Sequence, residues 1–360
     1  MNFDPSEEQR LLADAVGKLL EAHAAVPRDP GKVWRDYADL GLLALPFPSQ
    51  LGGLGGGPET IMLVMEAYGR SLADAPYLQS VLLAGRVLAL AGAAEPLAPL
   101  LSGERRAALC LYEPGARYRW DTPTSSATRT QQGWTVRGHK LAVLDAPGVD
   151  MLLWPAATAD GLGLFLVPVR TPGLTLDARP TPDGRPAADV QLADITLPAD
   201  AAICPPGQSR AILAEAIDGA TAALCSEAIG AMEALLAITI DYLGVRYQFG
   251  AALGSFQALQ HRAADMLVAI EQARSITIFA ISRLDAPAGQ RHVAVAAAKA
   301  LVNRSARFVG SEAIQLHGGM GLAAEYPAGR YFQRLTVLET LLGDTEHLLS
   351  EVERGGGLAA

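Results

Sequence analysis

The spacing of apolar residues changes twice along this 360-residue chain, and these two changes limit the folds it can adopt. Residues 1–105 and 206–360 repeat apolar side chains every three or four positions, the period of a helix. Residues 106–205 carry short apolar or alternating runs separated by Gly, Pro, Asp and Thr, which is typical of strands joined by turns. We therefore expect an α+β protein with an N-terminal helical domain (1–105), a middle antiparallel β-barrel or sandwich (106–205) and a C-terminal helical domain (206–360). A parallel βαβ sheet is not expected, because no helix-length stretch lies between the strands.

The C-terminal segment predicts a four-helix bundle. Long apolar patterns separated by short breakers suit helices that pack against their sequence neighbours. The patterns cover residues 212–242, 256–284, 293–316 and 331–352. At the other end of the chain, Ser6 and Gln9 form a capping box before an apolar run, which predicts a helix that begins at residue 6.

Composition argues against several classes of protein. The 38 acidic residues exceed the 29 basic ones, and no Lys/Arg cluster is present, so we expect no nucleic-acid binding, which depends on phosphate neutralisation. Cys110, Cys204 and Cys225 form no C-x-x-C pair, and the six histidines are scattered, so we expect reduced thiols, no metal site and a cytoplasmic location. The chain does not open like a signal peptide, and its apolar stretches predict no membrane span.

Two segments of the C-terminal third carry residue types that suit a nucleotide. Arg246 precedes a Gly turn and the pair Phe256-Gln257, and an arginine supplies the bidentate fork that binds phosphate. Residues 315–321, Gln-Leu-His-Gly-Gly-Met-Gly, end a long helix with glycines that let a ligand approach the backbone. Each segment taken alone also fits a helix C-cap followed by a packing turn.

Taken together and in this order, the segments resemble the acyl-CoA dehydrogenase family over nearly the whole chain. Arg246 with Gln248-Phe249-Gly250 looks like the family's R-x-Q-F-G, and residues 315–321 look like its Q-x-x-G-G-x-G. The other matches are residues 48–55 to P-x-x-x-G-G-x-G, residues 112–116 (Tyr-Glu-Pro-Gly-Ala) to T-E-P-G-A, and residues 138–140 to G-x-K. Within the family, the chain is similar to the bacterial branch of pimeloyl-CoA dehydrogenase small subunits and steroid side-chain acyl-CoA dehydrogenases.

The resemblance implies that FAD binds between the β-domain and the bundle and that the protein is an oligomer. Arg246 would meet the FAD pyrophosphate of a neighbouring subunit, and Phe249 would also reach that FAD. Gln315, Gly318 and Gly319 would bind the adenosine side across a dimer interface. The other residues implied at the cofactor are Gln248, Leu253, Phe256 and Gln257.

The resemblance also implies the reaction, which is α,β-desaturation of an acyl-CoA thioester in lipid metabolism. A carboxylate would remove the α-proton while the β-hydrogen leaves as hydride to the flavin. The implied pathways are steroid, dicarboxylic-acid or fatty-acid degradation, and the implied electron acceptor is an electron-transfer flavoprotein. The implied assembly is a homodimer, a homotetramer or a heterotetramer with a related subunit.

The chain departs from the family pattern at the catalytic base. The family's usual Glu falls at Leu342 in this register, and its second known location falls at Ala220. The nearest carboxylate on the same loop is Asp344, which we predict as the base, although a residue at this place also fits a helix cap. Glu227 is a second candidate. The competing interpretation is a polar residue on the surface of a helix or between two helices, with no part in catalysis.

Three functional interpretations remain open from the residues alone. The first is a working acyl-CoA dehydrogenase with a relocated base. The second is a subunit that completes the flavin site while an unlike partner carries the catalytic Glu. The third is another flavin reaction on the same fold, such as oxidation or hydroxylation of a small molecule.

Overall fold

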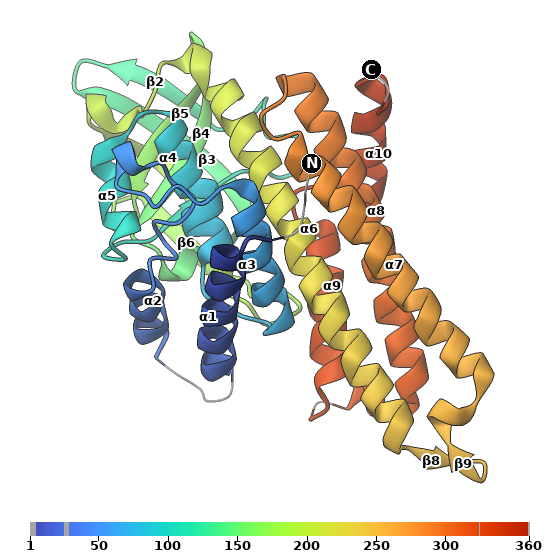
Figure 1. Ribbon diagram of the computed structural model, residues 1–360. Coiled ribbons are helices and arrows are strands. Elements are labelled where there is room, and N and C mark those ends of the chain that lie inside the picture. The colour runs from blue at the N-terminus through green and yellow to red at the C-terminus, as the bar shows by residue number, and fades with distance from the viewer. Residues whose placement is uncertain (1–4, 25–28, 324, 359–360) are drawn as a thin grey trace. The chain divides into compact units, whose positions relative to one another are not determined.

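The computed structural model describes residues 5–24, 29–323 and 325–358, and its order of elements is helices, then strands, then helices (Figure 1). This order confirms the α+β fold class. By internal contacts the chain divides into two compact units. Unit 1 holds Met1–Arg28, Gly57–Ala73 and Thr221–Ala360, and unit 2 holds Asp29–Gly56 and Asp74–Ala220. The division into domains 1–105, 106–205 and 206–360 stays a prediction.

Unit 1 is built mainly from helices, and the longest, α6, has its first residues in unit 2. The helices are α1 (Glu7–Ala24), α3 (Pro58–Arg70), α6 (Pro206–Val245), α7 (Gln257–Ser282), α8 (Ala288–His317), α9 (Pro327–Thr340) and α10 (Thr345–Arg354). The predicted capping box opens α1: the Ser6 amide donates to Gln9 Oε1 at 2.9 Å, and the Gln9 amide donates to Ser6 Oγ at 3.2 Å.

The prediction of one continuous fourth helix over residues 331–352 is wrong. The chain forms α9 and α10 there, separated by a turn at residues 341–344. Leu342 has φ +57° and Gly343 has φ +130°, and an α-helix cannot continue through such angles. The apolar periodicity runs on across this turn, which is why the sequence does not reveal the break.

Unit 2 contains one sheet and the remaining N-terminal helices. Its helices are α2 (Pro30–Asp39), the π-helix η2 (Tyr77–Gly85), α4 (Arg86–Leu90) and α5 (Ala94–Leu101). Its strands are β1 (Ala107–Leu109), β2 (Ser126–Thr130), β3 (Gly133–Leu144), β4 (Met151–Thr158), β5 (Gly161–Pro168), β6 (Leu174–Ala178) and β7 (Ala187–Leu197). In the described residues they form one seven-stranded sheet in the order β1-β4-β2-β3-β7-β6, with β5 on β4.

The sheet is mixed rather than purely antiparallel, which corrects the sequence-based expectation. The pairs β2–β3, β3–β7, β6–β7 and β4–β5 are antiparallel. However, β1 pairs with β4 in parallel, and β2 meets β4 in parallel at Ser126 and Ala157. The sequence shows short strands and turns, but the direction in which distant strands pair is set by how the sheet curls over its core. That core includes Trp134, Trp154 and Phe165.

Helices α3 and α6 approach so closely within unit 1 that only glycine fits where they cross. A Cβ added to Gly69 would lie 1.9 Å from the Glu227 carbonyl oxygen, and one added to Gly230 would lie 1.9 Å from the Glu66 carbonyl oxygen. No real Cβ contact is that short. The crossing therefore depends on a glycine in each helix.

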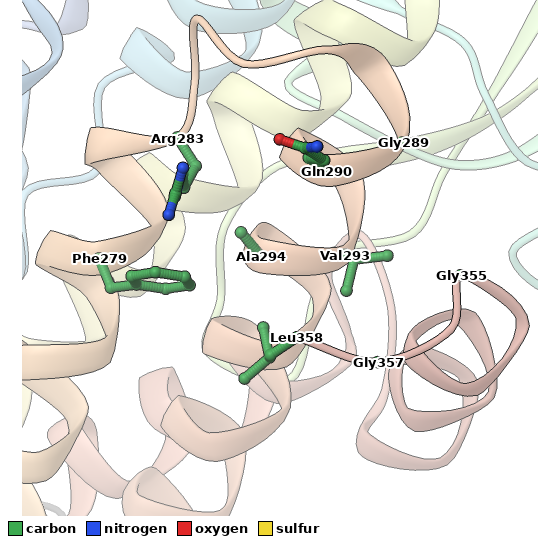
Figure 2. Close-up of a pocket in the computed structure, with 9 residues that line it drawn as sticks. All are labelled: Phe279, Arg283, Gly289, Gln290, Val293, Ala294, Gly355, Gly357 and Leu358. Atoms are coloured by element: carbon green, nitrogen blue, oxygen red, sulfur yellow. The ribbon is translucent and has the colours of Figure 1, made fainter. Parts of the chain in front are cut away.

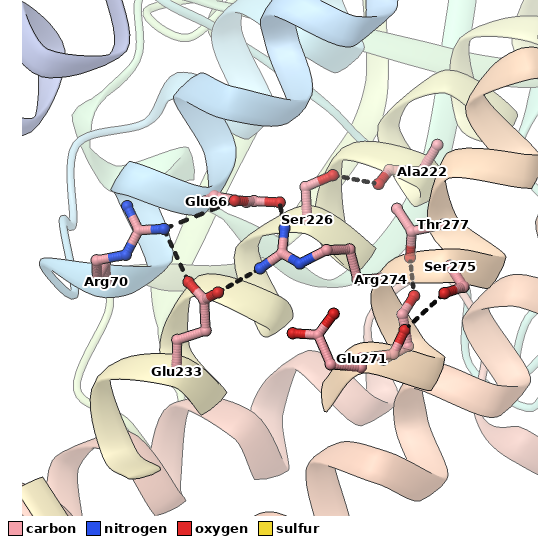
Figure 3. A network of polar contacts seen from close by, with 10 residues as sticks. Glu66, Arg70, Ala222, Ser226, Glu233, Glu271, Arg274, Ser275 and Thr277 are labelled. Atoms are coloured by element: carbon pink, nitrogen blue, oxygen red, sulfur yellow. Dashed lines mark hydrogen bonds and ion pairs between the residues drawn. The ribbon is translucent and has the colours of Figure 1, made fainter. Parts of the chain in front are cut away.

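Ion pairs surround this crossing and connect α3 to α7 as well (Figure 3). The Arg274 guanidinium of α7 donates to the carboxylates of both Glu66 and Glu233. Arg70 pairs with Glu233 at 2.8 Å, and its backbone carbonyl accepts a 2.5 Å hydrogen bond from the Tyr331 hydroxyl of α9. Glu66 is only 6% exposed, so its carboxylate would lose its counter-charge if α7 moved away, and these contacts favour one arrangement of the four helices.

Helix α6 is long and apolar enough to cross a membrane by length and composition alone. Of its most apolar window, 72% is buried inside the protein. The core helix of a globular protein shows the same combination. The pattern therefore gives only weak support for a membrane span.

The close crossing at Gly230 predicts that glycine-to-alanine substitutions at two positions of α6 have opposite effects on stability. Gly230→Ala should destabilise the protein by about 1–3 kcal/mol or more, because the new methyl group meets backbone atoms of α3. Gly219→Ala should stabilise it by about 0.5–1 kcal/mol, because a Cβ there meets nothing within 4 Å and alanine favours a helix. Urea unfolding of both variants checks the pair, and equal effects would contradict the crossing.

Candidate cofactor site at one end of the helical bundle

The first predicted cofactor segment forms an exposed hairpin between α6 and α7. Strands β8 (Tyr247–Gln248) and β9 (Ala251–Ala252) pair across Phe249 and Gly250, which have φ +57° and +83°. The Leu253 amide donates to the Arg246 carbonyl at 2.8 Å and closes the hairpin. The aromatic ring of Phe249 is 89% exposed. The hairpin therefore presents an aromatic side chain away from the bundle.

The other residues predicted in this segment lie on the same exposed surface. Arg246 follows the last residue of α6, and no carboxylate of the described residues pairs with its guanidinium. Gln248, Phe256 and Gln257 are exposed, and Leu253 is half-buried. A cation that lacks a protein counter-charge can bind a phosphate without first giving up another partner.

The second predicted segment is the end of α8, and the structure brings it to the same end of the bundle (Figure 1). Tyr242, one turn before Arg246, stacks on His317 with ring centroids 4.6 Å apart. Tyr326 contacts both rings, at 5.9 Å and 5.0 Å. This three-ring cluster places the two cofactor segments side by side, although about 70 residues separate them in the sequence.

The backbone after α8 is open to a ligand. Gly318 has φ +57°, and a Cβ on Gly318 or Gly319 would meet nothing within 4 Å. Gln315 is exposed one turn before them. His317 is buried, and its Nδ1 donates to the Ala313 carbonyl at 2.8 Å. Burial lowers the pKa of the His317 imidazole, which suits a neutral structural ring rather than a charged ligand contact.

The predicted base, Asp344, caps a helix in this structure. Its carboxylate accepts a 2.9 Å hydrogen bond from the His347 amide at the start of α10. Leu342 lies in the turn two residues earlier. The turn is held by Asn303 of α8, whose side-chain amide donates to the Glu339 and Gly343 carbonyls at 3.2 and 3.3 Å. The structure therefore shows Asp344 as a helix cap, which is the competing interpretation. The catalytic role of Asp344 stays a prediction.

The turn and the cofactor segments lie at different levels of the bundle. Asn303 and His317 are 14 residues apart in α8, which is about 21 Å along a helix. The residues expected at the base and those expected at the FAD adenosine are thus well separated on this chain.

The second candidate base, Glu227, is committed to a buried ion pair. Its carboxylate accepts a 2.8 Å hydrogen bond from Arg334 of α9, and the two side chains are 1% and 4% exposed. Removing a proton from a substrate would require this pair to separate. The structure therefore favours the structural interpretation of Glu227.

Sequence reasoning missed one pair of charged residues in unit 2. Glu113, from the match to T-E-P-G-A, and Lys140, from the match to G-x-K, form an ion pair of 2.8 Å. The two motif matches single out both residues in the sequence. Only the fold shows that their side chains form an ion pair.

A cavity of about 510 Å³ in unit 1 lies away from all of these residues (Figure 2). It is formed by the end of α7, the start of α8 and the C-terminal tail. Its lining includes Phe279, Arg283, Gln290 and Leu358. None of the predicted cofactor residues lines it, so it is separate from the candidate site.

Comparison with known proteins identifies the family of this chain. Residues 6–103 match the model "Acyl-CoA dehydrogenase, N-terminal domain", and residues 210–356 match "Acyl-CoA dehydrogenase, C-terminal domain". The chain belongs to the acyl-CoA dehydrogenase family. Members of this family are FAD-dependent oxidoreductases that act on a CH–CH bond of an acyl-CoA, and FAD is the cofactor.

Individual relatives agree with this assignment over most of the chain. The short-chain specific acyl-CoA dehydrogenase of human mitochondria is 30% identical over 88% of this chain and 80% of the relative. The solved structure of a steroid ACAD, Tcur3481-Tcur3483, is 30% identical with a TM-score of 0.86 and 98% of each chain covered. The ChsE4-ChsE5 complex of Mycobacterium tuberculosis is 27% identical with a TM-score of 0.88 and 98% of each chain covered.

The residues present fit an FAD at the end of the bundle. The exposed Arg246, the exposed ring of Phe249 and the open backbone at Gly318 and Gly319 supply a cation, an apolar contact and unhindered amide groups. A dinucleotide needs these three kinds of group for its pyrophosphate and rings.

Arg246→Ala should reduce FAD affinity about 10- to 100-fold, since a hydrogen bond to a charged group contributes about 1.5–3 kcal/mol. Arg304→Ala is the matched control, because Arg304 is also exposed on the bundle but lies in the middle of α8. Flavin content per chain after gel filtration measures retention. Equal flavin content in the Arg246 variant and the parent would show that this arginine does not hold the cofactor.

Proposed function

We propose that this chain works as one subunit of an acyl-CoA dehydrogenase made of unlike subunits, in which a related partner carries the catalytic Glu. The observation that carries the proposal is the turn at residues 341–344. The family's base position is Leu342, which cannot accept a proton, and the carboxylate of Asp344 is bound to the start of α10. A structural relative, the ChsE4-ChsE5 complex, is a complex of two differently named subunits and supports such an assembly.

Exposed apolar side chains at the cofactor end of the bundle support a partner subunit there. Val245 is 82% exposed, Tyr247 65%, Phe249 89% and Leu322 76%. Apolar groups gathered on one exposed end mark an interaction site more often than a free surface. A homodimer or homotetramer is the alternative assembly, and it would cover the same groups.

This chain's own residues would then bind and orient the cofactor and the thioester. Arg246 would hold the FAD pyrophosphate, with Phe249, Leu253 and Phe256 against it. Gln315 and the amides of Gly318 and Gly319 would hold the adenosine side, with Gln248 and Gln257 nearby. Bound FAD supplies the hydride acceptor for the β-hydrogen, and the partner's carboxylate takes the α-proton.

The substrate we propose is a bulky acyl-CoA, such as a steroid side-chain thioester, with a dicarboxylic acyl-CoA as the alternative. The similarity to a steroid ACAD at 30% identity supports the first. We propose an electron-transfer flavoprotein as the acceptor, as the resemblance implies. We propose the cytoplasm as the location, because the three cysteines are unpaired.

The lone chain should not bleach its flavin with acyl-CoA, whereas the chain purified with a related subunit that carries the Glu should do so. Stopped-flow absorbance with a panel that includes steroid and dicarboxylic acyl-CoAs measures the reaction. Bleaching by the lone chain at the same rate would rule out a base supplied by the partner.

Two variants separate the remaining roles of the turn. Asn is as good a helix cap as Asp, so Asp344→Asn should keep the stability within a few tenths of a kcal/mol. If Asp344 is nevertheless the base, this variant should lose at least about a hundredfold of the turnover.

Leu342→Glu in the lone chain should create activity if the pocket lacks only its base. Leu341→Glu, one residue earlier, is the matched control and should create none.

A further inference from the structure

Two buried polar side chains of α8, Lys299 and Asn303, have no part in the chemistry described so far. Lys299 is 1% exposed and Asn303 is 2% exposed, and they lie four residues apart on one face of the helix. Burial lowers the pKa of the Lys299 ammonium to about 8, so the group still carries its charge near neutral pH. A charge buried in a helical bundle is costly unless it is paired or hydrogen-bonded.

The two side chains bind one stretch of backbone, which is the end of α9 and the turn that follows it. The Lys299 ammonium donates to the Leu338 carbonyl at 2.8 Å and to Asn303 Oδ1. Because Oδ1 faces the ammonium, the amide nitrogen of Asn303 is turned toward the Glu339 and Gly343 carbonyls, to which it donates at 3.2 and 3.3 Å. The last carbonyls of a helix lack partners within that helix, and these two side chains supply partners here. Lys299 thus fixes the orientation of the amide that holds the turn.

The turn needs to be held, because its backbone is strained at one residue. Leu342 has φ +57°, a region that few residues other than glycine adopt. The next residue is Gly343, with φ +130°, and a Cβ there would lie 2.9 Å from Leu348 Cδ2. Residues in strained conformations persist only where their surroundings determine them, and they gather at functional sites. The strain in this turn falls on Leu342, the position of the family's base.

The shape of the turn does not depend on which side chain stands at position 342. The hydrogen bonds from Lys299 and Asn303 go to backbone carbonyls, and the cap at Asp344 binds a backbone amide. None of these bonds involves the side chain of Leu342. A different side chain at this position would therefore be presented in the same direction.

We propose that Lys299 and Asn303 are positioning residues that hold the turn at residues 341–344 in the shape that presents a base at position 342, and that this chain keeps the shape although Leu342 cannot act as a base. The inference rests on the proposed function, which assigns the base to this position. It accounts for a buried ammonium and a strained leucine at the same turn. A general base has to lie within hydrogen-bond reach of the proton that it removes, so the direction of the side chain decides whether a carboxylate placed there can act.

Asn303→Asp tests the proposal, because aspartate keeps the shape and the bond from Lys299 but cannot donate to the carbonyls of the turn. Arg307→Met is the matched control. Arg307 lies one turn further along α8 and also binds α9, but through the carboxylate of Glu339, to which its Nε donates at 3.2 Å. The control therefore removes a contact between α8 and α9 without touching the backbone of the turn.

Two measurements report the two parts of the proposal. Hydrogen–deuterium exchange of peptides that cover residues 338–347 reports the order of the turn without cofactor or substrate, and peptides from the sheet of unit 2 are the internal reference. The values of kcat and KM, measured with each variant combined with Leu342→Glu, report the positioning of a base. The substrate is the acyl-CoA of the same panel that Leu342→Glu oxidises fastest.

Asn303→Asp should speed exchange in the turn at least about tenfold, since exchange follows local opening of the backbone. Combined with Leu342→Glu, it should lower kcat at least about tenfold and change KM less than about threefold, since a small misplacement of a catalytic group is costly in rate. Arg307→Met should do neither. Unchanged exchange would overturn the holding of the turn, and faster exchange with unchanged kcat, or a change in KM alone, would overturn the positioning role.

The remaining outcomes separate this inference from the proposed function. If Leu342→Glu stays inactive while the parent chain with its partner subunit bleaches its flavin, the proposed function stands and the turn does not keep the shape of a base site. If neither is active, the proposed function fails, and the exchange rates still decide whether Lys299 and Asn303 hold the turn. If Asn303→Asp does not fold, Lys299→Met replaces it, because methionine removes the ammonium that orients the amide of Asn303.

Discussion

The crossing of α3 and α6 at Gly69 and Gly230 is the contact on which the helical unit depends. Backbone meets backbone there, so the ion pairs around it have short, fixed geometry. Arg274 can reach both Glu66 and Glu233 only because α3 lies this close to α6. The same approach lets the Tyr331 hydroxyl of α9 reach a carbonyl of α3. A segment from near the N-terminus thus belongs structurally to the C-terminal bundle.

Much of the fold could be predicted from the sequence, and the two segments expected at the cofactor could be recognised there as candidates. Helical spacing and turn residues identify most elements, and Ser6 with Gln9 marks a helix start that the structure confirms. These signals are local, so they do not show that β1 runs parallel to β4 or that the last helix breaks at Leu342. The break depends on Asn303, a residue about 40 positions away, binding the carbonyls of the turn.

The candidate site was predictable in its parts and not in its assembly. The residues around Arg246 and Gly318 have chemistry that can be recognised one motif at a time. Their proximity depends on the stacking of Tyr242 on His317, which no spacing rule reveals. For Asp344 the sequence misleads in the other direction. Its position in the chain suits a catalytic base, whereas its carboxylate makes the hydrogen bond of a helix cap. A carboxylate can lie close in sequence to the family's base position and still be held by a hydrogen bond elsewhere in the structure.

The exposed apolar hairpin between α6 and α7 has a consequence for how the protein is made. In the lone chain Tyr247 and Phe249 are exposed to water, and under the proposed assembly they stay so until another subunit covers them. Such surfaces are what chaperones and proteases recognise, and they promote self-association at high concentration. Under the proposed assembly, the cell has to balance the supply of the two subunits, and an excess of this chain would be cleared or would aggregate.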